Sequence, residues 1–166
     1  MRVLAGDIGG TKTRVGVFDV DGVGSSLTVT TQTDLPGDYG SGILLVGDLG
    51  RGALNGSNSA TVDARSLQVG AASFYDDGMG GGRQYGGYLP SVTASGEGSV
   101  TIVGGSQVTV TSGVNAPNLG VNIARDSGTL GSVVVNGLGS SLTSTDGSGR
   151  ISVARYGTGD LIVEDG

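Results

Sequence analysis

The sequence predicts an all-β fold, a β-solenoid in which short strands stack in successive coils. Three observations lead to this prediction: short apolar–polar alternations recur, pieces of the chain repeat one another, and glycine supplies 35 of the 166 residues. Glycine normally makes up roughly 7% of a protein. Alternating strands bury one face only, so they need strands above and below them to build a core. Glycine, asparagine and aspartate at the corners would supply the backbone angles that sharp bends require.

The internal repeat is clearest in the C-terminal stretch, residues 137–166. Its segments Arg-Ile-Ser-Val and Asp-Leu-Ile-Val alternate in the way that half-buried strands do. Three pairs of segments repeat one another: 22–28 with 137–143, 40–54 with 147–161, and 122–129 with 152–158. Units that recur along a chain are the signature of a solenoid, in which each unit packs on its neighbours.

Residues 1–22 form a first unit that differs from the rest and reads as a β-hairpin. Residues 1–6 are a short apolar strand, residues 7–13 a glycine-containing turn, and residues 14–20 a second, alternating strand. Two interpretations of this hairpin stay open: a cap on the solenoid, or a unit that precedes it.

Residues 23–166 form the predicted solenoid. Alternating or β-branched segments separated by glycine or asparagine mark its strands, in this order: 25–31, 43–47, 53–63, 66–70, 98–103, 106–111, 118–125, 131–137, 150–153 and 160–163. The segments 43–47 and 66–70 share one pattern, with Leu-x-Val-Gly at their ends. The small number of aromatic residues suits the narrow interior of such a coil.

An insertion near residues 71–88 interrupts the regular pattern. It gathers Phe74, Tyr75, Tyr85 and Tyr88 around a run of glycines. Insertions in solenoids map to loops on one face, and tyrosine with glycine and serine is typical of recognition surfaces. Two interpretations stay open: a glycan-binding loop, or a loop folded back on the solenoid whose aromatics only pack locally.

Composition and charge exclude several classes of function. The net charge is −6 and the basic residues are scattered, so we expect no nucleic-acid partner. No apolar run is long enough to cross a bilayer. The chain has no cysteine and no histidine, which removes disulfides, thiolate metal sites and imidazole catalysis. The acidic pairs Asp76-Asp77 and Glu164-Asp165 would point apart or into solvent. We therefore expect no catalytic residue, no metal and no cofactor.

Residues 4–18 read Leu-Ala-Gly-Asp-Ile-Gly-Gly-Thr-Lys-Thr-Arg-Val-Gly-Val-Phe. This segment resembles the first phosphate loop of the ROK-type sugar kinases and glucokinases, which have the actin-like ATPase fold. The resemblance implies that Asp7 lies near a metal ion and that four residues approach nucleotide phosphates: Gly9, Gly10, Thr11 and Lys12. Glycines let backbone N–H groups approach an anion, and a lysine adds positive charge.

The other parts of such a kinase are not found in the sequence. It contains no Asn-Asp pair to supply the catalytic base, no zinc-binding cysteines and almost no stretch with helical periodicity. Because these parts are missing, we keep the kinase function only as the alternative: a fragment of an ATP-binding sugar kinase that uses residues 7–13. We expect a cofactor site only under this alternative.

Residues 22–166 resemble the passenger repeats of type V autotransporter adhesins. Three segments carry the resemblance: 137–143, 118–125 and 150–166. It implies a right-handed parallel β-helix on the outer surface of a Gram-negative cell, secreted through an outer-membrane barrel. We expect a structural or adhesive role, with a host or neighbouring-cell glycan or protein, or a second copy, as the partner. Because the sequence shows no signal peptide, no barrel and a kinase-like start, we interpret it as a fragment, a fusion or an artificial chain.

Overall fold

The protein is all-β in the residues that its computed structural model describes, which are 2–8, 13–29, 43–48, 50–71, 96–111, 120–145 and 150–165. No helix occurs within these ranges. The strands are β1 (Arg2–Ile8), β2 (Thr13–Asp21), β3 (Ser26–Val29), β4 (Ile43–Asp48), β5 (Arg51–Ser57), β6 (Thr61–Ala64), β7 (Ser66–Ala71), β8 (Glu97–Val103), β9 (Gln107–Val110), β10 (Val121–Ile123), β11 (Leu130–Asn136), β12 (Ser141–Ser144), β13 (Ile151–Val153) and β14 (Thr158–Glu164).

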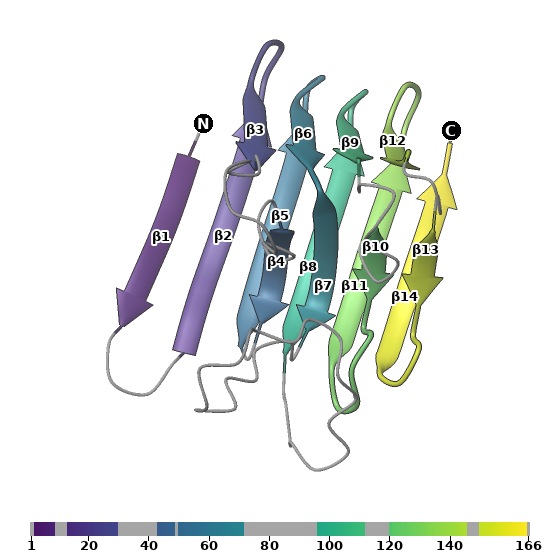
Figure 1. Cartoon of the computed structure of the whole chain (residues 1–166). Coiled ribbons are helices and arrows are strands. Elements are labelled where there is room, and N and C mark those ends of the chain that lie inside the picture. Colours follow the sequence, from purple (N-terminus) through teal and green to yellow (C-terminus); the bar gives the residue numbers. More distant parts are fainter. Residues whose placement is uncertain are drawn as a thin grey trace, which may run out of the picture.

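The strands form three sheets, which we name A, B and C. Sheet A has the order β1-β2-β5-β8-β11-β14 and extends across Figure 1 from β1 in purple to β14 in yellow. Sheet B has the order β12-β9-β6-β3, and sheet C has the order β13-β10-β7-β4. Every described strand pair is parallel except β1 with β2. Antiparallel pairing would need a reversal of the chain, whereas parallel neighbours need a connection that returns to the same end.

The chain visits the three sheets in a fixed order. From β2 onward successive strands belong to sheets A, B and C in turn, until β14 returns to sheet A. Each round therefore adds one strand to each sheet, next to the strand of the round before.

The strand register places the sequence repeats at matching positions. Leu44 pairs with Leu67, Leu67 with Val121, and Val121 with Ile151, so the segments 40–54 and 147–161 enter sheet C in the same frame. The repeats 22–28 and 137–143 both lead into the outermost strands of sheet B. The repetition in the sequence is therefore a repetition of position within the sheets.

The core is made of short aliphatic side chains contributed by all three sheets. Along sheet A the register aligns Leu54, Val100 and Val133, each at most 1% exposed. Sheet B contributes Val62 and Val108 to the same cluster. Such residues stabilise the fold by about 2 kcal/mol each when fully buried, and β-branched ones also suit extended backbone.

A column of glycines within sheet A lets sheets A and C approach each other. The register aligns five glycines on successive strands: Gly16, Gly52, Gly98, Gly131 and Gly159. A Cβ atom on Gly98 would lie 2.2 Å from the carbonyl oxygen of Val46 and 2.3 Å from the backbone nitrogen of Gly70. Gly52, Gly98, Gly131 and Gly159 do not have a left-handed backbone, so the requirement at the column is space. This differs from the expectation that glycine serves corners.

The corners that follow the strands of sheet C do need a left-handed backbone. Gly47 and Gly70 have φ angles of 75° and 64°, and in the later rounds Ala124 and Ala154 adopt 51° and 52°. Alanine in this region costs about 1–2 kcal/mol, which the surrounding sheets must offset. The repeated segments Ile-Ala-Arg at 123–125 and Val-Ala-Arg at 153–155 thus mark a corner in the same way as Val-Gly.

The N-terminal hairpin is continuous with sheet A. β1 pairs antiparallel with β2 from Arg2↔Asp19 to Ile8↔Thr13, and β2 pairs parallel with β5 from Gly16↔Gly52 to Asp21↔Ser57. The Nδ2 of Asn55 donates to the Oδ1 of Asp19 at 2.8 Å across the second pairing. The hairpin therefore adds two strands to sheet A before the first strand of sheet B.

Candidate functional site

The outer face of sheet A carries a short four-residue motif on four strands. It reads Arg-Gly-Ala-Leu at 51–54, Glu-Gly-Ser-Val at 97–100, Leu-Gly-Ser-Val at 130–133 and Thr-Gly-Asp-Leu at 158–161. The glycine and the aliphatic residue face the core, because successive side chains alternate between the two faces of a strand. The first and third residues therefore point outward from sheet A.

These outward positions form two columns that run across the strands. The first column holds Arg51, Glu97, Leu130 and Thr158, and the register of β5, β8, β11 and β14 places them side by side. The second column holds short side chains apart from its last member: Ala53, Ser99, Ser132 and Asp160. A column of long side chains beside a column of short ones leaves a depression that follows the stacking direction.

A groove occupies this depression and has a volume of about 480 Å³. Its lining consists of both columns and three glycines of the inner column: Arg51, Gly52, Ala53, Glu97, Gly98, Ser99, Leu130, Gly131, Ser132, Thr158 and Asp160. It lies at the starting ends of the parallel strands of sheet A, which Figure 1 shows side by side.

The charges of the groove nearly balance. The Nε of Arg51 lies 2.7 Å from the Oε2 of Glu97, and the two side chains are 81% and 46% exposed. An ion pair this exposed contributes about 0–1 kcal/mol to stability, so it is free to exchange partners with a ligand. Asp160 adds a second carboxylate at the other end of the groove.

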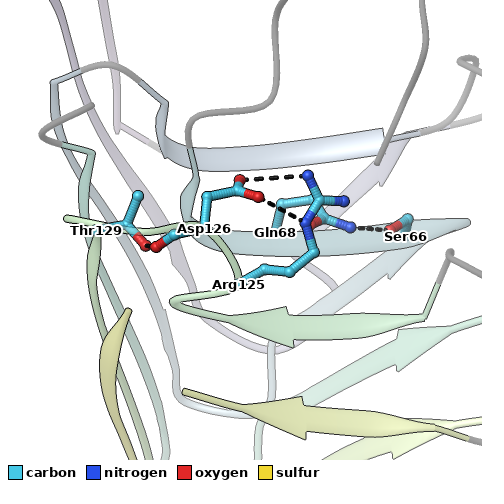
Figure 2. Close-up of polar contacts among 5 residues, drawn as sticks. All are labelled: Ser66, Gln68, Arg125, Asp126 and Thr129. Atoms are coloured by element: carbon cyan, nitrogen blue, oxygen red, sulfur yellow. Dashed lines mark hydrogen bonds and ion pairs between the residues drawn. The ribbon is translucent and has the colours of Figure 1, made fainter. Parts of the chain in front are cut away.

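A second polar cluster lies beside sheet C and is buried. Figure 2 shows its two pairs of side chains, Arg125 with Asp126 and Gln68 with Ser66. Nε of Arg125 donates to Oδ1 of Asp126 at 3.0 Å, and its Nη2 donates to Oδ2 at 3.2 Å. Their side chains are only 10% and 17% exposed. Thr129 closes the same corner, because its Oγ1 donates to the carbonyl oxygen of Asp126 at 2.7 Å.

The other pair belongs to the outer face of sheet C. Nε2 of Gln68 donates to Oγ of Ser66 at 2.8 Å, and that hydroxyl donates to the carbonyl oxygen of Gly120 at 2.9 Å. Gln68 is 3% exposed, and its Oε1 has no hydrogen-bond partner within the described part of the chain. β7 is buried along its whole length. The expectation that each strand buries one face only is therefore wrong for β7, where polar pairing accommodates the second buried face.

The described residues hold no cluster of side chains typical of a metal site. No group of three acidic, cysteine or histidine side chains lies close enough to hold a metal ion within the described ranges. In the same part of the chain no helix is long and apolar enough to span a bilayer. Glu97, the carboxylate best placed in the groove, is already paired with Arg51.

Most residues singled out from the sequence lie outside the described ranges. These include Gly9, Gly10, Thr11 and Lys12 of the kinase-like segment, the insertion from Phe74 to Tyr88, and Asp76 and Asp77. Asp7 belongs to β1, where its backbone pairs with Arg14. Glu164 accepts a hydrogen bond at 3.2 Å from the Nδ2 of Asn136, and Asp165 follows β14 at a φ angle of 51°. The Asn136 contact ties Glu164 to its neighbouring strand.

Sequence reasoning missed the groove, although the signal is in the sequence. The four copies of the motif can be aligned by their glycine followed by a small or acidic residue and an aliphatic one. Reading the third position as outward-facing would have placed Ser99 and Ser132 next to each other. A comparison with family models, curated proteins and solved structures finds no significant match to this chain.

Proposed function

We propose that the chain is a structural and adhesive segment built as a right-handed parallel β-helix, and that it acts without catalysis. The observation that carries this proposal is the fixed order in which the strands join sheets A, B and C. A chain that adds one strand to each sheet per round winds as a coil. Parallel crossovers of this kind are right-handed in about 98% of cases, which supports the handedness.

The composition of the outer faces favours adhesion over chemistry. On sheet B the outward positions form two columns of mainly hydroxyl, amide and carboxylate side chains: Ser26, Thr61, Gln107 and Ser141, and Thr28, Asp63, Thr109 and Thr143. On sheet A the groove repeats one motif four times. Repeated short polar groups suit a partner that is contacted at many points, and each contact contributes little by itself.

The resemblance to autotransporter passengers supports a bacterial cell-surface location and a glycan or protein on another cell as the partner. Self-association is the second form of adhesion that the proposal includes. Both forms use the outer surface of the coil, which the core residues do not enter.

Adhesion by the intact chain tests this function. Beads coated with the folded chain are mixed with mammalian or bacterial cells, and beads coated with the heat-unfolded chain serve as the control. We expect folded-chain beads to bind cells or one another, together with a β-dominated circular dichroism spectrum and the elongated shape of a coil in solution scattering. Equal retention of both bead types, or a largely helical spectrum, would contradict the proposal.

A nucleotide-binding sugar kinase fragment is the second candidate. The observation that favours it is the antiparallel pairing of β1 and β2. The last pair in this register is Ile8↔Thr13, the residues on either side of the kinase-like segment 9–12. Titration with ATP·Mg²⁺ tests it, using the intact chain and a Lys12→Ala variant. Saturable binding that the variant loses would support this candidate, and the absence of saturable binding to the intact chain would remove it.

A further inference from the structure

We propose that the groove on the outer face of sheet A binds a neutral, linear glycan that lies across the strands, along the stacking direction. The inference rests on the proposed adhesive function and assigns the ligand class to a named site. The groove is lined by residues of β5, β8, β11 and β14, and each strand contributes the same two outward positions.

The direction of the groove favours a ligand made of repeated units. Neighbouring strands lie about 4.8 Å apart, so equivalent side chains recur at that interval along the groove. This interval is close to the length of one sugar unit in an extended glycan. Each sugar would then meet the same kind of surface as the one before it: a backbone glycine, a short floor residue and a longer rim residue.

The charge of the groove favours a neutral ligand. Arg51 supplies one positive charge, while Glu97 and Asp160 supply two negative charges, so the sum is −1. Binding of sulfated or uronic-acid polymers and of nucleic acids depends on a surplus of basic side chains, which this groove lacks. Sugar hydroxyls can donate to the two carboxylates and accept from the guanidinium, and hydrogen bonds to charged groups are the stronger kind.

The groove also offers apolar surface to a ligand. The methyl group of Ala53, the glycine Cα atoms and Leu130, which is 49% exposed, give the groove its apolar surface. The C–H face of a sugar ring can pack on such a surface while its hydroxyls reach Ser99 and Ser132. Among the described residues no aromatic side chain lines the groove, so each sugar binds weakly and affinity grows with the length of the glycan.

An extended peptide is a poorer fit to the same groove. Peptides that add to sheets pair with the free backbone groups of an edge strand. The strands β5, β8 and β11 have neighbours on both sides, so their backbone groups are already paired, and of the strands below the groove only β14 lies at an edge of sheet A. The groove therefore offers side chains and not a backbone ladder.

A matched pair of double variants tests the assignment. Ser99 and Ser132 are register partners on the groove floor, and the variant S99Q/S132Q fills it with two longer neutral side chains. Thr111 and Thr145 follow β9 and β12, outside the groove and outside the two outward columns of sheet B, and their hydroxyl oxygens lie 3.1 Å apart, so T111Q/T145Q is the control with the same number of glutamines. Circular dichroism would check that both variants fold.

The probes are neutral glucan oligosaccharides of increasing length on an array, with heparin as the polyanion. We expect binding to rise with glucan length, to fall by about tenfold or more in S99Q/S132Q, and to stay within about twofold in T111Q/T145Q, since two lost polar contacts account for roughly a factor of ten. Equal losses in both variants, no loss in S99Q/S132Q, no glucan binding at all, or preferential binding of heparin would each overturn the assignment. If cell adhesion nevertheless persists in S99Q/S132Q, the ligand assignment alone fails; if the intact chain adheres to nothing, the proposed function fails with it.

Discussion

Replacing Gly52 with alanine adds one methyl group to the inward face of β5 and tests why sheet A carries a glycine column. The added Cβ would lie 2.4 Å from the backbone nitrogen of Gly47 and 3.2 Å from the carbonyl carbon of Val46. Carbon atoms at optimal separation are about 3.5–4.0 Å apart, so one strand must move by about 1 Å. The obstacles are backbone atoms, and no change of rotamer can relieve the contact.

The expected cost follows from this geometry. Overpacking of a well-packed interior costs about 1–3 kcal/mol, and we expect the upper end of that range because the clash is with backbone. Gly56 offers the matched control, since it lies on the same strand and the same face, four residues further on. A Cβ on Gly56 would meet the Cβ of Ser106 at 3.5 Å, which is an ordinary contact. Alanine there also restricts the unfolded chain, so we expect a stabilisation of about 0.4–1 kcal/mol.

Urea denaturation followed by far-UV circular dichroism measures both changes. With a slope of about 1–3 kcal/mol per molar urea, G52A should unfold at least about 1 M earlier than the parent protein. G56A should unfold at the same urea concentration or slightly later. Equal midpoints for the two variants would refute the reasoning, because they differ only in what the added methyl group touches.

Three further predictions concern polar groups. Arg125→Ala removes the buried partner of Asp126 and should lower the free energy of unfolding by about 3 kcal/mol. Arg155 lies at the equivalent exposed corner, where its guanidinium is 5.2 Å from a tyrosine ring. By the same denaturation assay, Arg155→Ala should lower the free energy of unfolding by less than about 1 kcal/mol. Ser144→Ala should stabilise by about 1 kcal/mol, because the buried Ser144 hydroxyl has no hydrogen-bond partner among the residues that the structure describes; a lower thermal midpoint would contradict this. Hydrogen bonds from two side chains of the next round hold the pKa of Asp21 below its usual 3.8. The contribution of Asp21 to stability is therefore complete above about pH 3.8, and it is lost as the pH falls through the lower folded-state pKa. An NMR titration that gives a pKa of 3.8 or more for Asp21 would count against the two hydrogen bonds.

Those two donors to Asp21 come from the corner after β5. The Oγ of Ser57 and the Nδ2 of Asn58 both lie 2.7 Å from the Oδ1 of Asp21. The corner thereby connects β2 to the following round through side chains as well as through the backbone ladder.

The part of the fold that the sequence predicts best is the part that depends on periodicity. Alternation located the strands, and the repeat between 40–54 and 147–161 anticipated a shared register that the pairing of Leu44, Leu67, Val121 and Ile151 realises. Local alternation and repetition are properties of neighbouring residues, so a sequence can report them.

Other features depend on contacts between rounds, which no local pattern encodes. Gly98 and Gly104 look alike in the sequence, but Gly98 allows close approach of two sheets while Gly104 takes a φ angle of 62° at a corner. Ala124 takes a corner angle that local preference would assign to glycine. Gln68 looks like a solvent-facing residue of an alternating strand and is 3% exposed. For Gly98 the deciding neighbours, Val46 and Gly70, are many residues away along the chain.

The groove follows from the same separation between inside and outside. The glycine and aliphatic positions of the four-residue motif are fixed by the core, and they read Gly-Leu or Gly-Val in register on four strands. The two outward positions carry no such constraint, and they vary from Arg and Ala to Thr and Asp. Substitution at those positions therefore changes the groove strand by strand while leaving the packing of the core unchanged. A scaffold of this kind can alter what it binds by single outward substitutions, and Asp160 in place of serine is such a change at the last strand of the series.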